Sequence, residues 1–376
     1  MIGHIAVSLG ALRANARALR ELVLPARAAF VVKSNAYGHG LVEVALAVEP
    51  FAEQLCVYSI EEALALRHGG VTAPVLVMGP VPPGALDAAY TAKVSIALWD
   101  VHGYLYDVVR VAERRHGEFP VHVKVDTGTS RFGIDAREAA DAIEEYLRRP
   151  ELQVAGIFSH LAAAEELDSP FTLAQLARLE NVSRRIEPLL RKSSVRPQLH
   201  IAASAAAMLW PQTRLDMVRI GIAVYGLWPS PKTAEAMRAA SFELRPALEY
   251  TSTVSAVREI EAGTAVGYGL SYVAPERTRI GVVPLGYADG IPRALSNRGA
   301  FVVEGVRCPI VGRVCMNVTL LDLGAAPAAR AGSTVTLIGE QGGASVSADD
   351  WAASAETINY EIVARLPSEI PRHYEA

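Results

Sequence analysis

The chain has 376 residues, 51% of them hydrophobic and 20% charged, which excludes a disordered protein and predicts two or three domains of ~150 residues each. The net charge is −4 and no block of basic residues occurs, so we expect no nucleic-acid partner and no binding to an anionic membrane surface. The three cysteines lack zinc-type spacing, and we predict neither a disulfide framework nor a metal site.

The N-terminus lacks a basic segment followed by an apolar run, so no secretory signal is expected. No window of about 20 residues is apolar and free of charge, so no membrane span is expected either. These features favour a soluble, cytoplasmic protein.

Up to about residue 225, short β-branched runs alternate with longer segments of helical periodicity. Among the predicted helices are 60–68, 137–149 and 172–190. The first has a capping box, Ser59 with Glu62, and ends at Gly69-Gly70. The eight predicted strands are 28–32, 55–59, 74–78, 94–99, 121–125, 154–159, 198–202 and 217–224. Eight strands that alternate with helices predict a parallel (β/α)8 TIM-like barrel of the α/β class.

The pattern changes after Pro246. Strand-like runs and Gly-rich turns occupy 247–338, and a final helix is predicted to begin near Ala348. The stretch 229–240, which contains two prolines, is predicted to be a linker. We therefore expect a barrel at 1–238 followed by a mainly β domain at 239–376.

The chain has only five lysines, and two of them lie in apolar, strand-like runs, which is unusual for a solvated charge. The five are Lys33, Lys93, Lys124, Lys192 and Lys232. Lys33 ends the first predicted strand, at the end of a barrel where functional side chains gather. A lysine at the mouth of an apolar pocket has a destabilised ammonium and can form a Schiff base. The alternative is a lysine that extends from the strand end into solvent.

Several motifs occur in a fixed order around and after Lys33. They are Lys-Ser-Asn-Ala-Tyr-Gly-His-Gly (33–40), Lys-Val-Asp-Thr-Gly-Thr-Ser-Arg-Phe-Gly (124–133), Val-Arg-Ile-Gly-Ile-Ala-Val-Tyr-Gly-Leu (218–227), Val-Gly-Tyr-Gly-Leu-Ser-Tyr (266–272), Pro-Leu-Gly-Tyr-Ala-Asp-Gly (284–290), Val-Gly-Arg-Val-Cys-Met-Asn (311–317) and Thr-Ile-Asn-Tyr-Glu (357–361). With this ordered set the chain resembles the bacterial alanine racemases, which are pyridoxal-phosphate enzymes built from a barrel and a β-domain. The resemblance extends from Lys33 to Tyr374.

The resemblance implies an isomerase that interconverts L- and D-alanine through a pyridoxal 5'-phosphate aldimine and supplies D-alanine for cell-wall peptidoglycan. It also implies a homodimer with active sites shared between subunits. Lys33 would form the internal aldimine and act as the base on one face of the substrate Cα. Tyr268, from the β-domain of the other subunit, would be the base on the opposite face, as racemisation requires. The alternative for Tyr268 is an ordinary aromatic residue of a turn.

Arg219 matches the family position at the pyridine nitrogen of the cofactor, and His160 belongs to the same polar network. A guanidinium can only donate a hydrogen bond, so the ring stays neutral, which favours return of the proton to Cα over transamination. The alternative for Arg219 is a salt bridge with Asp216.

The phosphate of the cofactor would be held at the ends of the last two barrel strands. Ser204 offers a hydroxyl, and Gly221 and Ile222 offer backbone N–H groups. The resemblance adds the phenols of Tyr37 and Tyr360. Ser204 is alternatively, or additionally, a helix N-cap.

Three further residues are assigned by resemblance. Arg131 would contact the phenolic oxygen of the cofactor and the substrate carboxylate, and the backbone N–H of Met316 would lie near that carboxylate. The family lysine that matches Lys124 is N-carbamylated in several members and holds the matching arginine. We expect either this modification or a Lys124–carboxylate pair, because an uncompensated buried ammonium is costly.

The chain departs from the family pattern at a few positions. Asn317 stands where Asp is usual, which leaves substrate breadth open. Milder departures occur at Ser34, Leu161 and Glu165. By resemblance, Tyr287 and Arg293 match two family positions that line the entry corridor.

Other readings of the chain remain. A racemase of broader specificity or a serine racemase would have the same fold, although Tyr360 narrows the pocket and favours alanine. A pyridoxal-phosphate-binding barrel without racemase activity would lack the β-domain. An amino-acid decarboxylase of barrel and β-domain would carry an acid in place of Arg219.

Overall fold

The computed structural model describes residues 3–100, 103–191 and 196–376, so Lys192 lies outside the described residues. The chain forms two compact units. The first comprises Met1–Gly10, Tyr37–Gly40 and Ala247–Ala376, and the second comprises Ala11–Ala36 and Leu41–Pro246. Each unit is described by itself below.

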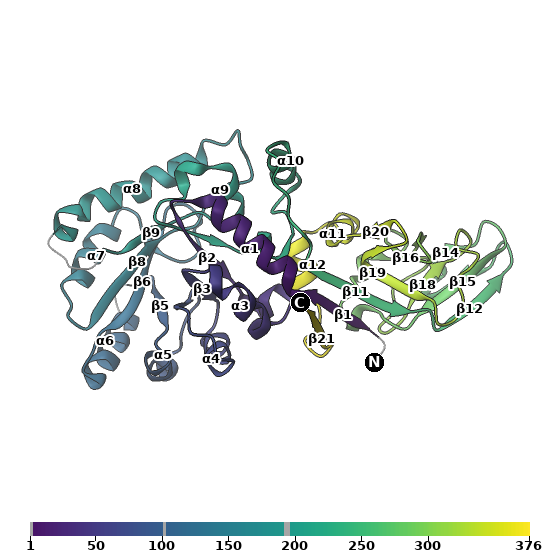
Figure 1. Cartoon of the computed structure of the whole chain (residues 1–376), viewed down its shortest axis with the longest axis horizontal. Helices are drawn as coiled ribbons and strands as arrows, with labels where there is room; N and C mark the ends of the chain where they lie inside the picture. The colour runs from purple at the N-terminus through teal and green to yellow at the C-terminus, as the bar shows by residue number, and fades with distance from the viewer. Residues whose placement is uncertain (1–2, 101–102, 192–195) are drawn as a thin grey trace. The chain divides into compact units, whose positions relative to one another are not determined.

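The larger unit is a parallel barrel, and the eight strands expected from the sequence are all present (Figure 1). Around the barrel they follow the order β10 (Met217–Ile220), β2 (Arg27–Val31), β3 (Gln54–Val57), β4 (Val75–Val77), β5 (Ser95–Leu98), β6 (Phe119–Asp126), β8 (Leu152–Phe158) and β9 (Gln198–His200). The last and first strands are joined by two backbone hydrogen bonds, Asp216 N to Leu199 O at 3.1 Å and Arg219 N to Ala202 O at 2.9 Å. The predicted (β/α)8 barrel is therefore confirmed, with a short extra strand β7 (Ile134–Asp135) beside β6.

Helices alternate with these strands and cover the outside of the barrel (Figure 1). They are α1 (Leu9–Val23), α3 (Leu41–Val48), α4 (Ile60–His68), α5 (Leu86–Thr91), α6 (Gly103–Arg115), α7 (Ala139–Leu147), α8 (Phe171–Leu190), α9 (Ser204–Leu209) and α10 (Pro231–Ala239). The capping box that begins α4 is confirmed, because Ser59 Oγ accepts from Glu62 N and the Glu62 carboxylate accepts from Ser59 N. Gly69 ends that helix, as predicted.

The prediction of a linker at 229–240 is wrong, because most of this stretch is α10 within the barrel unit. Ser230 caps the helix by accepting from Thr233 N at 3.2 Å. Pro231 occupies the first turn, where a missing N–H costs nothing. The prolines therefore mark the start of a helix.

The smaller unit is mainly β-structure, as predicted. Its largest sheet has the order β17 (Val306–Pro309), β16 (Ala300–Val303), β19 (Thr334–Gln341), β11 (Leu248–Thr253), β1 (His4–Ser8) and β21 (Arg372–Glu375), with β20 (Ala344–Val346) beside β19. A second sheet contains β12 (Ala256–Ile260), β15 (Thr278–Val283) and β18 (Thr319–Asp322), and a third contains β13 (Ala265–Val266) and β14 (Tyr272–Val273). Helices α11 (Ala348–Ala355) and α12 (Asn359–Ala364) follow, so the helix expected near Ala348 is confirmed.

The N-terminal strand β1 belongs to the sheet of the smaller unit. It pairs antiparallel with β11 and parallel with β21. Ile5 and Val7 of β1 are fully buried, so burial of its apolar face accompanies the pairing.

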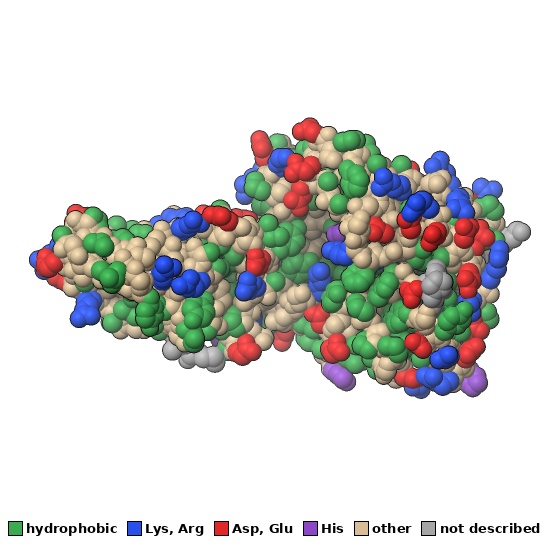
Figure 2. Space-filling model, turned by 180° about the vertical axis from the view of Figure 1, so that it is seen from behind, with side chains coloured by type: hydrophobic (Ala, Val, Ile, Leu, Met, Phe, Trp, Pro, Cys, Tyr) green, Lys and Arg blue, Asp and Glu red, His purple; other side chains and the backbone are tan. Residues whose placement is uncertain are grey.

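The surface of the barrel unit mixes both signs of charge. On the face shown in Figure 2, Lys and Arg side chains are interspersed with Asp and Glu. Within the residues described, no helix combines the length and apolar character that crossing a bilayer demands.

Candidate active site

The candidate residues of the barrel unit lie at the carboxyl ends of its strands. Lys33 follows β2, His160 follows β8, and Ser204 follows β9. Lys124 and Arg219 lie within the last residues of β6 and β10. Because the strands are parallel, all five are at the same end of the barrel.

Lys33 begins a left-handed turn, α2 (Lys33–Tyr37). Ser34, Asn35 and Ala36 have φ values of 55°, 53° and 50°, a region that costs a non-glycine residue about 1–3 kcal/mol. Glu62 holds this turn to the next strand, because its carboxylate accepts from Ser34 N and from Tyr58 N. The surrounding structure therefore maintains a strained backbone directly after the lysine.

The surroundings of Lys33 favour its neutral form. Its Nζ lies 5.8 Å from the centre of the Tyr58 ring. Burial lowers the pKa of the amine, the positive charge of Arg131 lowers it further, and Glu62 opposes the shift. A neutral amine is the nucleophile that a Schiff base requires.

Arg219 is buried and held by four acceptors. Burial lowers the pKa of the guanidinium to about 10, so it remains a cation at neutral pH. Its ζ carbon lies 5.2 Å from the centre of the Phe158 ring. The acceptors are His200 Nδ1 at 2.7 Å, Ser159 O at 2.7 Å, Ile201 O at 3.3 Å and His160 Nδ1 at 3.5 Å. These bonds use the two Nη groups and leave the Nε–H for another acceptor.

The alternative of a salt bridge between Arg219 and Asp216 is wrong. The Asp216 carboxylate accepts from Leu199 N at 2.7 Å instead. Since Arg219 lies near the end of β10 and Asp216 precedes that strand, the two residues lie toward opposite ends of the barrel wall.

A chain of buried histidines extends from Arg219. Because a guanidinium only donates, His200 Nδ1 must be the acceptor, and the His200 proton lies on Nε2. That proton is donated to His122 Nδ1 at 3.0 Å, which fixes the second tautomer as well. Burial, and then the charge of Arg219, lower the pKa of His122 and of His160 to about 3 and that of His200 well below 6.5. The guanidinium is therefore surrounded by neutral imidazoles.

This histidine pair was not assigned by the sequence analysis. His122 lies two residues before Lys124 on β6, so alternation places both on one face of the strand. That signal was available for His122, but nothing local to His200 connects it with a strand 78 residues earlier.

Lys124 is buried, and none of the carboxylates that the structure describes forms an ion pair with it. Burial, and then the positive charges of Arg219 and Arg131, lower its pKa to about 8, and Asp126 opposes the shift. Its Nζ lies 5.5 Å from the centre of the Phe158 ring. Within residues 3–100, 103–191 and 196–376 no ion pair to Lys124 occurs, so the predicted alternative of a Lys124–carboxylate pair is wrong there.

Ser204 and Gly221 connect the ends of the seventh and eighth barrel strands. Ser204 Oγ accepts from Gly221 N at 3.0 Å, and Ile222 begins the short helix η4 (Ile222–Tyr225). The N-cap of α9 is Ala203 and Ser204 is the first helical residue, so the expected N-cap role of Ser204 is wrong. Its hydroxyl hydrogen remains available to an anion, in the part of a TIM barrel where phosphate sites occur.

In the smaller unit, Tyr37 and Tyr360 lie beside each other, with ring centres 6.1 Å apart. Gly38 follows Tyr37 at a φ of 81°, and a Cβ there would lie 2.0 Å from Val363 O. Close approach to α12 therefore requires glycine after Tyr37.

Tyr268 lies in η5 (Tyr268–Leu270) and is 73% exposed in the single chain. Its neighbours Gly267 and Gly269 have φ values of 74° and 70°, which explains the Gly-Tyr-Gly motif. Nothing in its own unit covers this phenol.

Met316 is also exposed, at 57%, and its loop is bound to the turn of Tyr287. Tyr287 N donates to Cys315 O and Ala288 N donates to Met316 O, both at 2.9 Å. Asn317 Nδ2 approaches Asp289 Oδ2 at 3.4 Å, and Arg293 begins the short helix η7 (Arg293–Leu295).

The barrel residues fit the cofactor implied by the motifs. Arg131 and Arg219 carry positive charges, Lys33 and Lys124 are amines with lowered pKa values, and Glu62 and Asp126 are the carboxylates that act on the two lysines. These basic groups suit a phosphate and a carboxylate. The unused Arg219 Nε–H suits an unprotonated ring nitrogen, and Lys33 suits an aldehyde.

Comparison with known proteins gives a consistent result. Family models described as "Alanine racemase, N-terminal domain" and "Alanine racemase, C-terminal domain" match residues 7–229 and 247–374. The alanine racemase of Symbiobacterium thermophilum is 42% identical over 371 residues, which cover 98% of this chain and 96% of that protein. The crystal structure of alanine racemase from D-cycloserine-producing Streptomyces lavendulae has a TM-score of 0.93 at 34% identity and covers 100% of this chain and 97% of that one. The alanine racemase of Bartonella henselae, with covalently bound pyridoxal phosphate, has a TM-score of 0.86 at 26% identity and covers 100% of both chains.

Proposed function

The chain belongs to the alanine racemase family, and on that premise we propose that it is a pyridoxal-phosphate-dependent isomerase that interconverts L- and D-alanine. The observation that carries the proposal is Lys33, a half-buried amine with a lowered pKa at the barrel mouth, next to the charge of Arg131. When bound, pyridoxal phosphate supplies an electron sink that acidifies the Cα–H of the attached amino acid.

Lys33 holds the cofactor and moves a proton at one face of Cα. Tyr268 of the partner subunit moves a proton at the opposite face, so that a proton lost from one side is replaced from the other. High exposure of this tyrosine in the single chain supports a role in a shared site, and we propose a homodimer for that reason. On this proposal the barrel unit, which ends at Pro246 rather than at the expected residue 238, supplies Lys33 and Arg219, and the smaller unit provides the second base.

Arg219 selects the reaction. Its guanidinium donates to the ring nitrogen and retains its own proton, because its pKa of about 10 lies well above neutrality. His200 and His160 accept from it in their neutral forms and so hold it in place. Arg219 would therefore leave the ring nitrogen of a bound cofactor unprotonated, which would favour racemisation over transamination.

The remaining groups bind anions. Ser204, Gly221 and Ile222, with Tyr37 and Tyr360, bind the phosphate, and Arg131 and the backbone N–H of Met316 bind the substrate carboxylate. We also propose that Lys124 is carbamylated, which would place an anion near Arg131. A neutral amine adds CO2, and the lowered pKa of Lys124 supplies that form.

A chiral assay tests the function. The purified protein is supplied with L-alanine, D-alanine or L-serine, with and without pyridoxal phosphate, and the enantiomers are separated. Cofactor-dependent formation of D-alanine from L-alanine supports the proposed activity, and we further propose that this D-alanine serves peptidoglycan synthesis. Serine racemised as fast as alanine would indicate a broader racemase, and cofactor binding without any racemisation would refute the activity.

A further inference from the structure

Three polar side chains on one face of α8 bind loops of the active-site end of the barrel. They are one turn apart, at positions 172, 175 and 178. Thr172 Oγ1 donates to Ala163 O at 3.1 Å, and Arg178 Nη1 donates to Thr127 O. The loops that receive these bonds follow β8 and β6, and they carry His160 and Arg131.

Gln175, the middle residue of this face, binds both loops at once. It is completely buried. Its Nε2 donates to Thr127 Oγ1 at 3.2 Å and to His160 O at 3.0 Å, while its Oε1 accepts from Ala162 N at 2.8 Å. A carbonyl only accepts and a backbone N–H only donates, so these partners determine the orientation of the amide.

The contact with Thr127 continues toward Arg219. Since Thr127 Oγ1 accepts from Gln175, its hydroxyl proton is free to donate to Ser159 Oγ at 2.7 Å. Ser159 O in turn accepts from Arg219 at 2.7 Å. One buried amide is thus connected with His160, with Arg219 and with the loop of Arg131.

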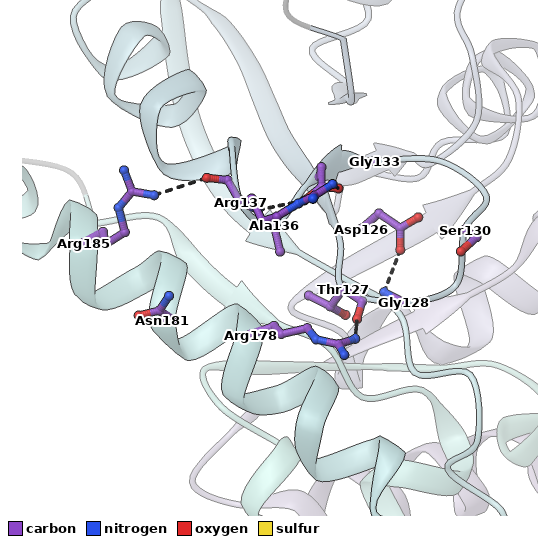
Figure 3. A pocket seen from close by; sticks show the side chains of 11 residues that line it. Asp126, Thr127, Gly128, Ser130, Gly133, Ala136, Arg137, Arg178, Asn181 and Arg185 are labelled. Atoms are coloured by element: carbon purple, nitrogen blue, oxygen red, sulfur yellow. Dashed lines mark hydrogen bonds and ion pairs between the residues drawn. The ribbon is translucent and has the colours of Figure 1, made fainter.

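The Arg131 loop is also fixed from its outer side (Figure 3). Arg178 extends from α8 to Thr127, and Asp126 accepts from Gly128 N at 2.8 Å. A Cβ on Gly128 would lie 2.8 Å from Phe171 Cζ, so the loop packs directly on α8. A cavity of about 630 Å³, whose lining side chains are drawn in Figure 3, is lined by Arg178 and Arg185 among others but not by Lys33.

Arg131 depends on its backbone for its position. Its side chain is exposed, and within the described residues it forms no hydrogen bond or ion pair. Thr127, four residues earlier, is where Gln175 holds the loop. A shift of Thr127 would therefore move the guanidinium of Arg131 without opposition from its own contacts.

We propose that Gln175 is a positioning residue that fixes the loops of Arg131 and His160 relative to each other. The group that binds the substrate carboxylate and the group beside Arg219 are thereby held at a constant separation. The proposal rests on the proposed function for the role of Arg131. It assigns to α8, an outer helix, control over substrate affinity.

The test compares three variants in the full-length protein. Gln175→Met keeps the size of the side chain and removes all three hydrogen bonds. Gln175→Glu keeps the shape. Val182→Ala is the control, because Val182 is buried on the same helix, and its truncation destabilises α8 while all the hydrogen bonds from α8 to the two loops remain.

We expect Gln175→Met to raise KM for alanine about tenfold. Of the three lost hydrogen bonds, the one to Thr127 fixes the loop of the charged Arg131, and the loss of one such bond has an effect of this size. Because Glu62 rather than Gln175 holds the turn of Lys33, kcat should change by less than about threefold. Amide hydrogen exchange should increase in peptides spanning 127–133 and 160–164. Val182→Ala should lower the melting temperature with KM and exchange in these peptides unchanged.

Gln175→Glu supplies a signature that a merely structural role lacks. A buried carboxyl is protonated at low pH, where it still accepts from Ala162 N and donates one hydrogen bond. As pH rises through its raised pKa the donor is lost and a charge faces His160 O. We therefore expect KM near the wild-type value at low pH and a rise with pH, whereas the KM ratio of Gln175→Met to wild type stays constant.

The proposal is overturned if Gln175→Met leaves KM and loop exchange within twofold of wild type. It is also overturned if Val182→Ala, at an equal loss of melting temperature, reproduces both effects. If the wild type racemises nothing, the proposed function fails. Loop exchange in the two Gln175 variants then still decides whether Gln175 holds the loops.

Discussion

Three histidines near Arg219, of which His122 and His200 are buried and His160 is partly buried, predict a marked loss of stability at mildly acidic pH. His122 and His160 have pKa values of about 3, and the pKa of His200 is also far below 6.5. In the unfolded chain each histidine has a pKa of ~6.5. Between these values the unfolded state binds more protons than the folded state, so stability rises with pH.

The size of the effect follows from the two pKa values. The contribution of each neutral histidine to the free energy of unfolding is fully present above pH 6.5 and is lost as pH falls from there toward 3. For one histidine the loss between pH 8 and pH 5 is ~2 kcal/mol, because each pH unit below the unfolded pKa costs ~1.4 kcal/mol. At pH 5 this value depends mainly on the unfolded pKa, provided that the folded pKa lies below ~4. His122 and His160 together give ~4 kcal/mol, a large part of the usual stability of a domain.

A single substitution isolates one histidine. In His122→Asn, Asn Oδ1 replaces Nδ1 as the acceptor from His200 and cannot titrate. Denaturant unfolding of the cofactor-free protein is measured from pH 5 to pH 8 through tryptophan fluorescence, since Trp99, Trp210 and Trp228 lie in the barrel unit. We expect the change in unfolding free energy between these pH values to be ~2 kcal/mol smaller than in wild type. His68→Asn, at the exposed end of α4, is the control.

An unchanged pH dependence in His122→Asn would refute the reasoning. It would mean that His122 is already charged in the folded state or is accessible to water. That result would contradict the roles assigned above, in which Arg219 can only donate to His200 and His200 therefore donates to His122.

Three predictions concern the proposed chemistry. Reduction of the cofactor-loaded protein with borohydride should attach the cofactor to the peptide of Lys33, and this product should be absent in Lys33→Ala but present in Lys93→Ala, where an exposed lysine is removed. Tyr268→Phe should stop solvent deuterium exchange at Cα for one enantiomer of alanine while cofactor affinity is retained; equal loss for both enantiomers would indicate a structural role. Because the pKa of Lys124 is about 8, its neutral fraction rises with pH through that value, and a carbamate signal from 13C-bicarbonate should grow between pH 7 and pH 9 and be lost in Lys124→Arg. A signal that persists in Lys124→Arg would assign the carbamate to another amine.

Local signals in the sequence were sufficient for the elements of the barrel. The start of α4 at Ser59 and Glu62 and its end at Gly69 depend only on hydrogen bonds between near neighbours. The position of Lys33 at a strand end follows from the same local pattern and from the parallel arrangement that alternation implies. Strand periodicity also located Lys124, a lysine in an apolar run, and the structure confirms that it is buried.

Contacts between distant segments could not be predicted in this way. The placement of β1 beside β11 and β21 joins residues more than 240 positions apart, and no short-range pattern encodes it. The misassigned linker at 229–240 shows the related difficulty that prolines mark both loops and helix starts. Burial of Thr233, Ala234 and Met237 against the barrel unit decides between the two.

The sequence by itself determined the family, the barrel and the identity of the candidate groups, because these depend on residue types in order and on periodicity. Tertiary structure alone decided what each group contacts. Arg219 donates to His200 and Ser159 rather than to Asp216, Lys124 forms no ion pair with a carboxylate among the residues described, and Gln175 connects two loops from a helix outside the barrel. The physical reason is that hydrogen-bond partners and burial are properties of spatial neighbours, which the closure of the barrel brings together from separate strands.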